Sequence, residues 1–175
     1  MTNPLFYAKI LLFGEYGIIE DSQGLTLPYS FYKGALKFSS LQSDFEKESN
    51  ESLKKYANYL KDLELPDAYT INISALQKDI RKGLFFDSNI PQGYGVGSSG
   101  ALVAAIFERY SIKTYLPEHI SKDELKDLKK IFGQMESYFH GKSSGIDPLI
   151  CYMNLPILIE NKENSGFPKG NNIGA

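Results

Sequence analysis

Apolar residues in the first half of the chain fall mostly in short runs or alternate with polar residues, a pattern typical of β-strands. Residues 7–20 indicate a strand, a turn at Gly14 and the start of a second strand. Residues 25–40 are rich in aromatic and β-branched side chains and predict further short strands. Apolar residues alternate over residues 69–77, which predicts a half-buried strand, and residues 83–91 indicate another.

Two segments have the spacing of amphipathic helices instead. Apolar residues recur at steps of three and four between residues 43 and 65, and Pro66 ends the pattern. The segment 121–141 is the clearest helix, because Ser121 and Glu124 form an S-x-x-E capping box ahead of an apolar stripe. A third helix is expected to begin near Ser98, after a glycine-rich segment.

The last part of the chain predicts a return to strands. Residues 147–162 are predicted as a strand pair, and residues 165–175 as a loop or tail. The resulting order of strands, helix, strands, helix, helix and strands favours the α+β class over an alternating parallel sheet.

Composition and charge exclude several classes of function and of site. Hydrophobic residues make up 42% of the 175 residues and the formal net charge is −2, so we expect neither a nucleic-acid-binding surface nor a membrane-binding surface. Cys151 is the only cysteine and there are two histidines, which excludes an internal disulfide and argues against a Cys/His metal cluster. No signal peptide and no apolar run of membrane-spanning length is evident, so a cytoplasmic protein is expected.

The segment 91–100, "PQGYGVGSSG", is the strongest candidate for a binding site. Its alternating glycines free backbone N–H groups to point into one concavity, and the helix that follows adds its own unpaired N–H groups and positive dipole end. A phosphate is the natural ligand of such a loop. The alternative is a glycine-rich lead into a core helix. The segment is neither a Walker A loop nor a dinucleotide fingerprint, because the lysine and the spacing that they require are absent.

Three charged residues could complete a phosphoryl-transfer site. Lys9 lies within an apolar strand, Glu136 lies near the C-terminus of the 121–141 helix, and Asp147 follows a Ser-Ser-Gly turn. A buried lysine needs an anionic partner, and a carboxylate at a helix C-terminus needs a cation or hydrogen-bond donors. Each residue also has an ordinary structural explanation: an edge-strand lysine, a solvated glutamate paired with His140, and a capping aspartate. Together they match what phosphoryl transfer to a hydroxyl requires.

Three segments resemble motifs of the GHMP small-molecule kinases, which act on galactose, homoserine, mevalonate or phosphomevalonate. The first, "KILLFGEY", is similar to K-x-[ILV]-[ILV]-x-G-E-H, and "PQGYGVGSSGA" is similar to the phosphate loop P-x-G-x-G-[LV]-G-S-S-[AG]. The third, "ESYFHGKSSGID", is similar to E-x-x-x-H-G-x-P-S-G-[VI]-D, a segment of the mevalonate kinase branch. The likeness extends from about Ala8 to Pro148.

The resemblance implies a role for each matching residue. Asp147 would be the catalytic base, and Lys9 would lower the pKa of the acceptor hydroxyl. Ser99 and Glu136 would hold Mg²⁺. The residues implied to bind the phosphates of ATP are Gly93, Gly95, Val96, Gly97, Ser98, Ser99 and Gly100. Those implied on the substrate side are Glu15, Tyr16 and His140.

The resemblance also implies an α+β N-terminal domain over residues 1–175, with a mixed sheet packed by helices and a left-handed βαβ unit. We expect the family's C-terminal domain to be absent from this sequence, and a homodimer is left open. The expected function is ATP-dependent phosphorylation of a small alcohol, with mevalonate first. The alternatives are another hydroxy acid or a sugar as acceptor, or a non-catalytic nucleotide-binding half. Two departures bear on these expectations, because Tyr16 replaces the motif's histidine and Ser143 its proline.

Overall fold

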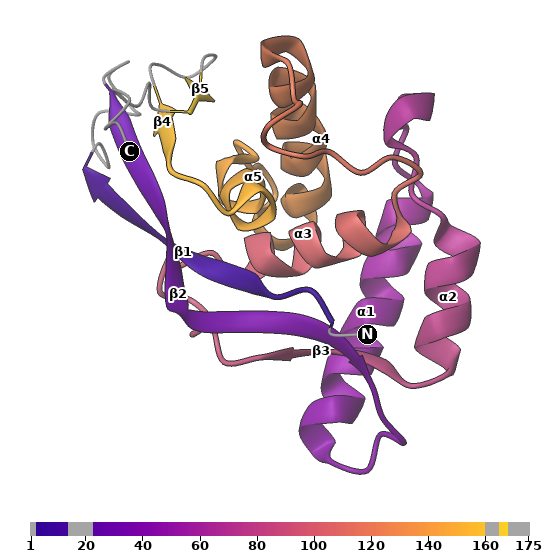
Figure 1. Ribbon diagram of the computed structural model, residues 1–175. Helices are drawn as coiled ribbons and strands as arrows, with labels where there is room; N and C mark the ends of the chain where they lie inside the picture. The colour runs from indigo at the N-terminus through magenta and orange to yellow at the C-terminus, as the bar shows by residue number, and fades with distance from the viewer. Residues whose placement is uncertain (1–2, 14–22, 160–164, 168–175) are drawn as a thin grey trace.

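The sheet is built around one long strand (Figure 1). The computed structural model describes residues 3–13, 23–159 and 165–167. The strands are β1 (Phe6–Phe13), β2 (Gly24–Phe38), β3 (Leu84–Ser88), β4 (Ile157–Ile159) and β5 (Ser165–Gly166). β1 lies along one edge of β2, while β3 and β4 pair with opposite ends of its other edge. Residues 25–40, expected to form several short strands, therefore belong largely to a single strand.

Every pairing between described strands is antiparallel, including that of β4 with β5. The α+β class is confirmed, and the mixed sheet is corrected to an antiparallel one in this part of the chain. The reason is that β1, β3 and β4 all pair with the same strand and all run opposite to it. The left-handed βαβ unit stays a prediction, since no two of the described strands are paired in parallel.

The helices gather on one side of the sheet (Figure 1). Their bounds are α1 (Asp44–Lys61), η1 (Asp67–Tyr69), α2 (Ile73–Arg81), α3 (Ser98–Tyr110), α4 (Lys122–His140) and α5 (Ile146–Met153). α3 is the central helix, because it packs against α5, α4, β1 and β2. Its small buried residues, among them Ala101 and Ala104, allow these close approaches.

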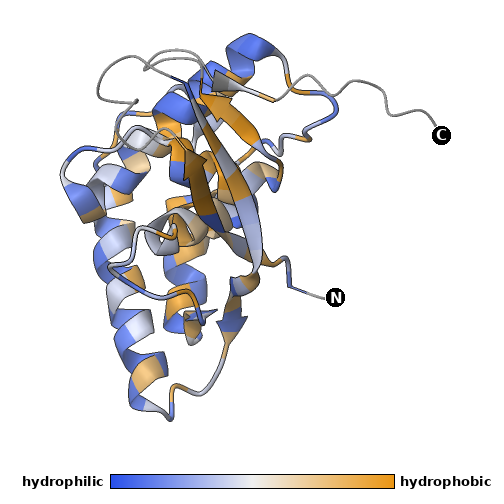
Figure 2. Cartoon of the chain, turned by 90° about the vertical axis from the view of Figure 1, so that its left-hand side faces the viewer, coloured by the Kyte–Doolittle hydropathy of each residue, from blue (hydrophilic) through white to orange (hydrophobic). Residues whose placement is uncertain are grey.

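Apolar residues also lie at the surface of the strands. Figure 2 shows that the strands are hydrophobic over part of their length. Leu12 and Phe13 at the end of β1 are about half exposed. No helix within the described ranges combines the length and apolar character needed to cross a bilayer.

Two strand predictions are wrong. Residues 69–77 contain the last residue of η1, an isolated bridge at Ile71 and the start of α2, because the Asn72 side chain caps α2 by accepting the N–H of Ala75. Ile73, Leu76 and Ile80 form a helical stripe, and a short alternating run ahead of such a stripe cannot be assigned by periodicity alone.

The predicted strand pair over residues 147–162 is, within the described residues up to 159, α5 followed by the single strand β4. Gly145, with φ of +75°, starts α5, and Asn154, with φ of +52°, ends it. Pro148 lies in the first turn, where a helix tolerates the missing N–H. The 121–141 prediction is confirmed, because Ser121 and Glu124 form the capping box of α4.

Candidate active site

The loop between β3 and α3 presents backbone N–H groups at the start of a helix. Gly93, Gly95 and Gly97 have φ values of +80°, +68° and +82°, a region that favours glycine. Gly97 is the N-cap of α3 and supplies no side-chain cap, whereas α1, α2 and α4 each have one. The first turn of α3 therefore keeps N–H donors and a positive dipole end available for an anion.

This loop forms one wall of a cavity of about 840 Å³. The volume lies within the ~300–1,000 Å³ of typical small-molecule sites. The opposite wall is contributed by α1, through Phe45, Glu48 and Ser52 among others. Asp147 and His140 also line the cavity. It is therefore large enough for a nucleotide that places its phosphates against the loop.

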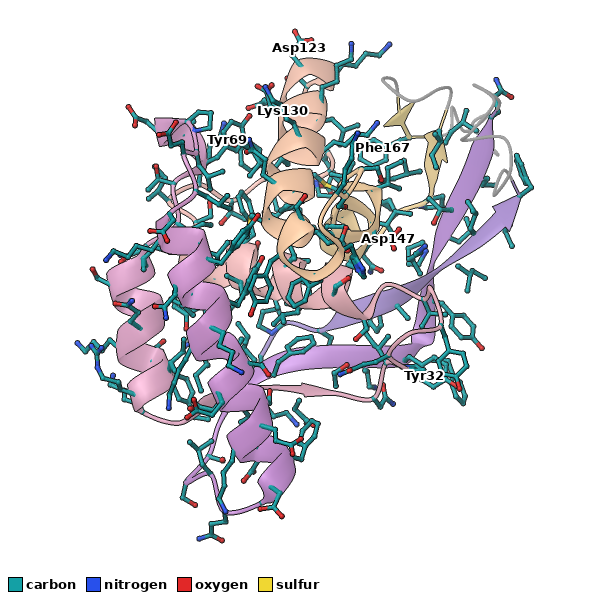
Figure 3. All side chains as sticks on the ribbon, turned by 180° about the vertical axis from the view of Figure 1, so that it is seen from behind. Tyr32, Tyr69, Asp123, Lys130, Asp147 and Phe167 are labelled. Carbon is teal, nitrogen blue, oxygen red and sulfur yellow. The ribbon has the colours of Figure 1, made fainter. Side chains whose placement is uncertain are left out.

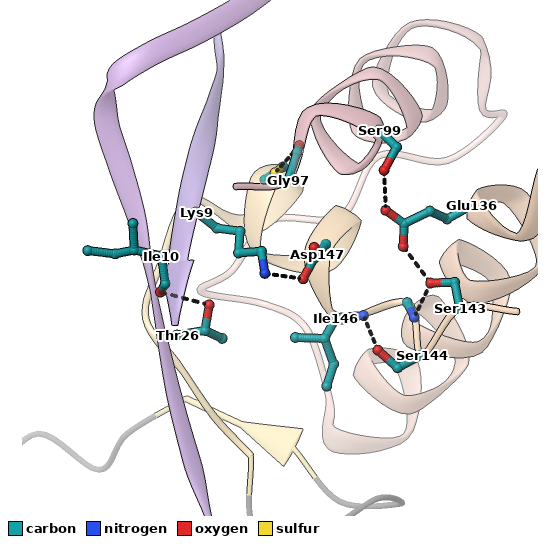
Figure 4. A network of polar contacts seen from close by, with 12 residues as sticks. Lys9, Ile10, Thr26, Gly97, Ser99, Glu136, Ser143, Ser144, Ile146 and Asp147 are labelled. Atoms are coloured by element: carbon teal, nitrogen blue, oxygen red, sulfur yellow. Dashed lines mark hydrogen bonds and ion pairs between the residues drawn. The ribbon is translucent and has the colours of Figure 1, made fainter. Parts of the chain in front are cut away.

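Lys9 reaches the loop from β1 through its backbone and its side chain. Its N–H donates to the carbonyl oxygen of Val96 at 2.9 Å, and its Nζ lies 3.0 Å from Oδ1 of Asp147 (Figure 4). The Lys9 side chain is 12% exposed and that of Asp147 is 32% exposed. A largely buried ammonium thus has the anionic partner that its desolvation requires, with one side of the pair open to the cavity.

Asp147 is held against the start of α3 by the packing of two helices. It is the second residue of α5, near the junction of helices and strands (Figure 3). A Cβ at Gly100 would lie 2.8 Å from the backbone carbon of Asp147 and 2.9 Å from the nitrogen of Pro148. Position 100 therefore has no room for a side chain, which explains a glycine inside this helix despite its low helix propensity.

Glu136, itself buried, joins α3 and α4 through a partly buried hydrogen-bond network. The Ser99 hydroxyl donates to Oε1 of Glu136 at 2.8 Å, and the Ser143 hydroxyl donates to Oε2 (Figure 4). Nε2 of His140 lies 3.0 Å from the Ser99 hydroxyl. Because the single proton of Ser99 goes to Glu136, His140 contributes the N–H of that second bond.

Burial makes the Glu136 carboxylate costly to ionise. Only 3% of the residue is exposed, and this burial raises its pKa above the usual range. The negative charge of Asp147 raises the pKa further, whereas the hydroxyls of Ser143 and Ser99 lower it. A divalent cation beside Glu136 would offset both the desolvation and the repulsion between the two carboxylates.

The donor set at Ser99 and Glu136 fits Mg²⁺, since Mg²⁺ prefers hard oxygen ligands. No group of three or more His, Cys, Asp or Glu side chains able to hold a metal occurs among the described residues. Mg²⁺ commonly takes one or two protein ligands and completes its shell with waters and substrate phosphates. A site with one carboxylate and one hydroxyl, beside a loop whose N–H groups can donate to an anion, follows that pattern.

The structure brings most of the sequence-predicted site residues together. Lys9, Asp147, the loop 93–100, Glu136 and His140 all lie around the loop end of the cavity. The predicted substrate-side residues Glu15 and Tyr16 lie outside the described residues.

Two parts of the site are not predicted from the sequence. One is the α1 wall, where Phe45 and Ser52 lie among the polar positions of an amphipathic helix and give no separate signal. The other is the Ser143 hydroxyl, whose contact with Glu136 depends on how α4 ends.

A comparison with protein families identifies the family of the chain. Residues 53–154 match the family described as GHMP kinases N terminal domain. The chain is also similar to the crystal structure of L. major mevalonate kinase in complex with R-mevalonate, with 13% identity and a TM-score of 0.48. That match covers 90% of this chain and 48% of the other, so the chain spans about half its length. No curated protein is significantly similar to the chain in sequence.

Proposed function

The chain belongs to the GHMP kinases through their N-terminal domain family, and on this premise we propose that it is the nucleotide-binding domain of an ATP-dependent small-molecule kinase. The observation that carries the proposal is the Lys9–Asp147 pair, with 3.0 Å between Nζ and Oδ1, at the cavity end where the glycine loop starts α3. An anion-binding loop beside a lysine and a carboxylate provides the groups that phosphoryl transfer to a hydroxyl needs.

The loop would bind the phosphates through its backbone. N–H groups at the start of α3 have no side-chain cap, so phosphate oxygens can accept from them without displacing a protein group. The residues assigned to this role are Gly93, Gly95, Val96, Gly97, Ser98, Ser99 and Gly100.

Ser99 and Glu136 would hold Mg²⁺, because their oxygens already lie 2.8 Å apart at the edge of the loop. A bound Mg²⁺ ion neutralises phosphate charge in such sites. Ser99 contributes an oxygen from the first turn of α3, and Glu136 contributes the compensating negative charge. His140, which contacts Ser99, would orient this hydroxyl.

Asp147 would take the proton from the acceptor hydroxyl. An alcohol has a pKa far above 7, so it becomes a useful nucleophile only when a base and a nearby cation act together. The Asp147 carboxylate lines the cavity and is partly exposed, so a hydroxyl can reach it. Lys9 would place its ammonium beside the developing alkoxide, since it already lies against the same carboxylate.

Mevalonate is the proposed acceptor, on the likeness of residues 136–147 to the mevalonate kinase segment. The alternative is another hydroxy acid or a sugar, because Tyr16 replaces the motif's histidine. A contact between the acceptor and Glu15, Tyr16 or His140 is part of the same proposal. A nucleotide-binding domain without catalysis is disfavoured by the paired Lys9 and Asp147.

A transfer assay tests this function. The 175-residue chain, in excess over γ-³²P-labelled ATP with Mg²⁺, is incubated with mevalonate, homoserine or galactose, and labelled products are separated. We expect labelled phosphomevalonate in a single turnover, slowly if a second domain is needed to exclude water from the site. ATP binding without transfer to any of the three acceptors would contradict the kinase proposal and favour the non-catalytic alternative.

A further inference from the structure

Ser143 lies in the turn between α4 and α5 and makes two hydrogen bonds with one hydroxyl (Figure 4). It donates to Oε2 of Glu136, and it accepts the backbone N–H of Gly145 at 3.0 Å. Glu136 belongs to α4, and Gly145 is the N-cap of α5. One side chain therefore connects the carboxylate proposed to hold Mg²⁺ with the start of the helix that carries Asp147.

The hydroxyl group is chemically suited to both bonds at once. It has one proton, which goes to the carboxylate, and lone pairs that remain free to accept from an N–H. Alanine would provide neither bond. Proline, the residue of the motif that this segment resembles, has no side-chain donor or acceptor either. The connection is thus a feature of this chain and follows from one of its departures from the motif.

The backbone around Ser143 is held by close packing, so the position from which its side chain extends is fixed. Gly145 has φ of +75°, and a Cβ there would overlap the Lys129 carbonyl oxygen. A Cβ at Gly133 would lie 2.9 Å from the Ser143 carbonyl oxygen. The turn is therefore pressed against α4, close enough for the short Ser143 side chain to reach Glu136.

We propose that Ser143 is a positioning residue, which fixes the Glu136 carboxylate and the N-terminus of α5 relative to each other. The inference rests on the proposed function, because the purpose of this arrangement is a fixed distance between the cation and the base. Without the hydroxyl, Glu136 keeps only its bond from Ser99, and the Gly145 N–H loses its acceptor. Loss of such a supporting contact typically weakens metal binding by about 10- to 100-fold.

Two measurements on the 175-residue chain test the inference, with Ser143→Ala, Ser143→Thr and Ser144→Ala as variants. The first follows free Mn²⁺ by electron paramagnetic resonance during titration with a non-hydrolysable ATP analogue, beside binding of the analogue without metal. The second measures amide hydrogen exchange of the ligand-free chain at Gly145. Ser144→Ala is the matched control, because its hydroxyl accepts the N–H of Ile146 at 3.4 Å from the same turn.

We expect Ser143→Ala to weaken Mn²⁺ binding about 10- to 100-fold and to leave metal-free binding of the analogue unchanged. A general loss of structure would lower both the Mn²⁺ affinity and the metal-free affinity for the analogue. Exchange at Gly145 should accelerate about two- to tenfold in this variant. Ser143→Thr keeps the hydroxyl and should retain the Mn²⁺ affinity, as should Ser144→Ala.

Three results would overturn the inference. One is full Mn²⁺ affinity in Ser143→Ala, and another is an equal loss in Ser144→Ala. The third is a chain with the original sequence that binds no Mn²⁺ with the analogue, which contradicts the proposed function as well. In that last case the exchange at Gly145 still shows whether Ser143 holds the turn, so the two failures are distinguishable.

Discussion

An Asp147→Asn variant is expected to transfer phosphate to the acceptor about 10²–10⁴-fold more slowly than the original chain. Asparagine has nearly the same shape but cannot accept the hydroxyl proton, so the loss should appear in the chemical step. ATP binding should be largely retained, because the loop at the start of α3 is proposed to supply most of the phosphate contacts. Single-turnover kinetics at saturating acceptor separates the two effects.

Two further variants define the origin of that loss. Asp87→Asn is the control, since it breaks another lysine–aspartate pair, with Lys37, among residues that do not line the cavity. Its transfer rate should be unchanged. Lys9→Met should slow the chemical step and leave ATP binding largely intact. A near-normal rate in Asp147→Asn would show that some other group activates the acceptor.

Replacing Gly145 with alanine is expected to lower the free energy of unfolding by about 2–5 kcal/mol. One part is the strain of an L-residue at φ of +75°, and the other is the overlap of the new Cβ with the Lys129 carbonyl oxygen. The Gly133 nitrogen would also lie 2.6 Å away, so α4 and the turn would have to separate. Urea unfolding followed by circular dichroism measures the change.

Gly141→Ala separates strain from overlap. Gly141 has φ of +70°, but no atom outside its immediate neighbours lies within 4 Å of the position a Cβ would take. With ψ of −38° its backbone lies outside the left-handed helical region, and its replacement should cost about 1–3 kcal/mol, the strain alone. Equal losses in the two variants would show that the packing of the turn against α4 does not contribute.

The sequence predicts helices best where a capping signal and an apolar stripe agree. Ser121 and Glu124 predict the start of α4, and Gly141 predicts its end. Each signal depends only on residues within a few positions of the helix end. The strand predictions over residues 69–77 and 147–162 are wrong because the apolar runs there fit both the strand period and the helix period. Helices form at these places because Asn72 caps α2 and Gly145 starts α5.

For the site, the sequence indicates which groups occur but not how they meet. The glycines of the loop 93–100 predict an anion-binding segment, and the apolar strand around Lys9 predicts an anionic partner for it. The identity of that partner, Asp147, depends on α3 packing closely against α5 at Gly100. The Mg²⁺ role proposed for Ser99 rests on a resemblance, and that of Glu136 rests on the resemblance and on its place at a helix C-terminus. The Ser143 contact depends on how the turn after α4 packs, which local sequence does not indicate.

The most direct test of the central claim is the response of the loop amides to nucleotide. The chain is labelled with ¹⁵N, and ¹H–¹⁵N spectra are recorded during titration with Mg²⁺ and a non-hydrolysable ATP analogue. The account predicts that the largest shifts occur at the amides of residues 93–100, at the start of α3, with smaller shifts near Asp147. Binding that leaves these amides unmoved and shifts another part of the chain, or no binding at millimolar analogue, would contradict it.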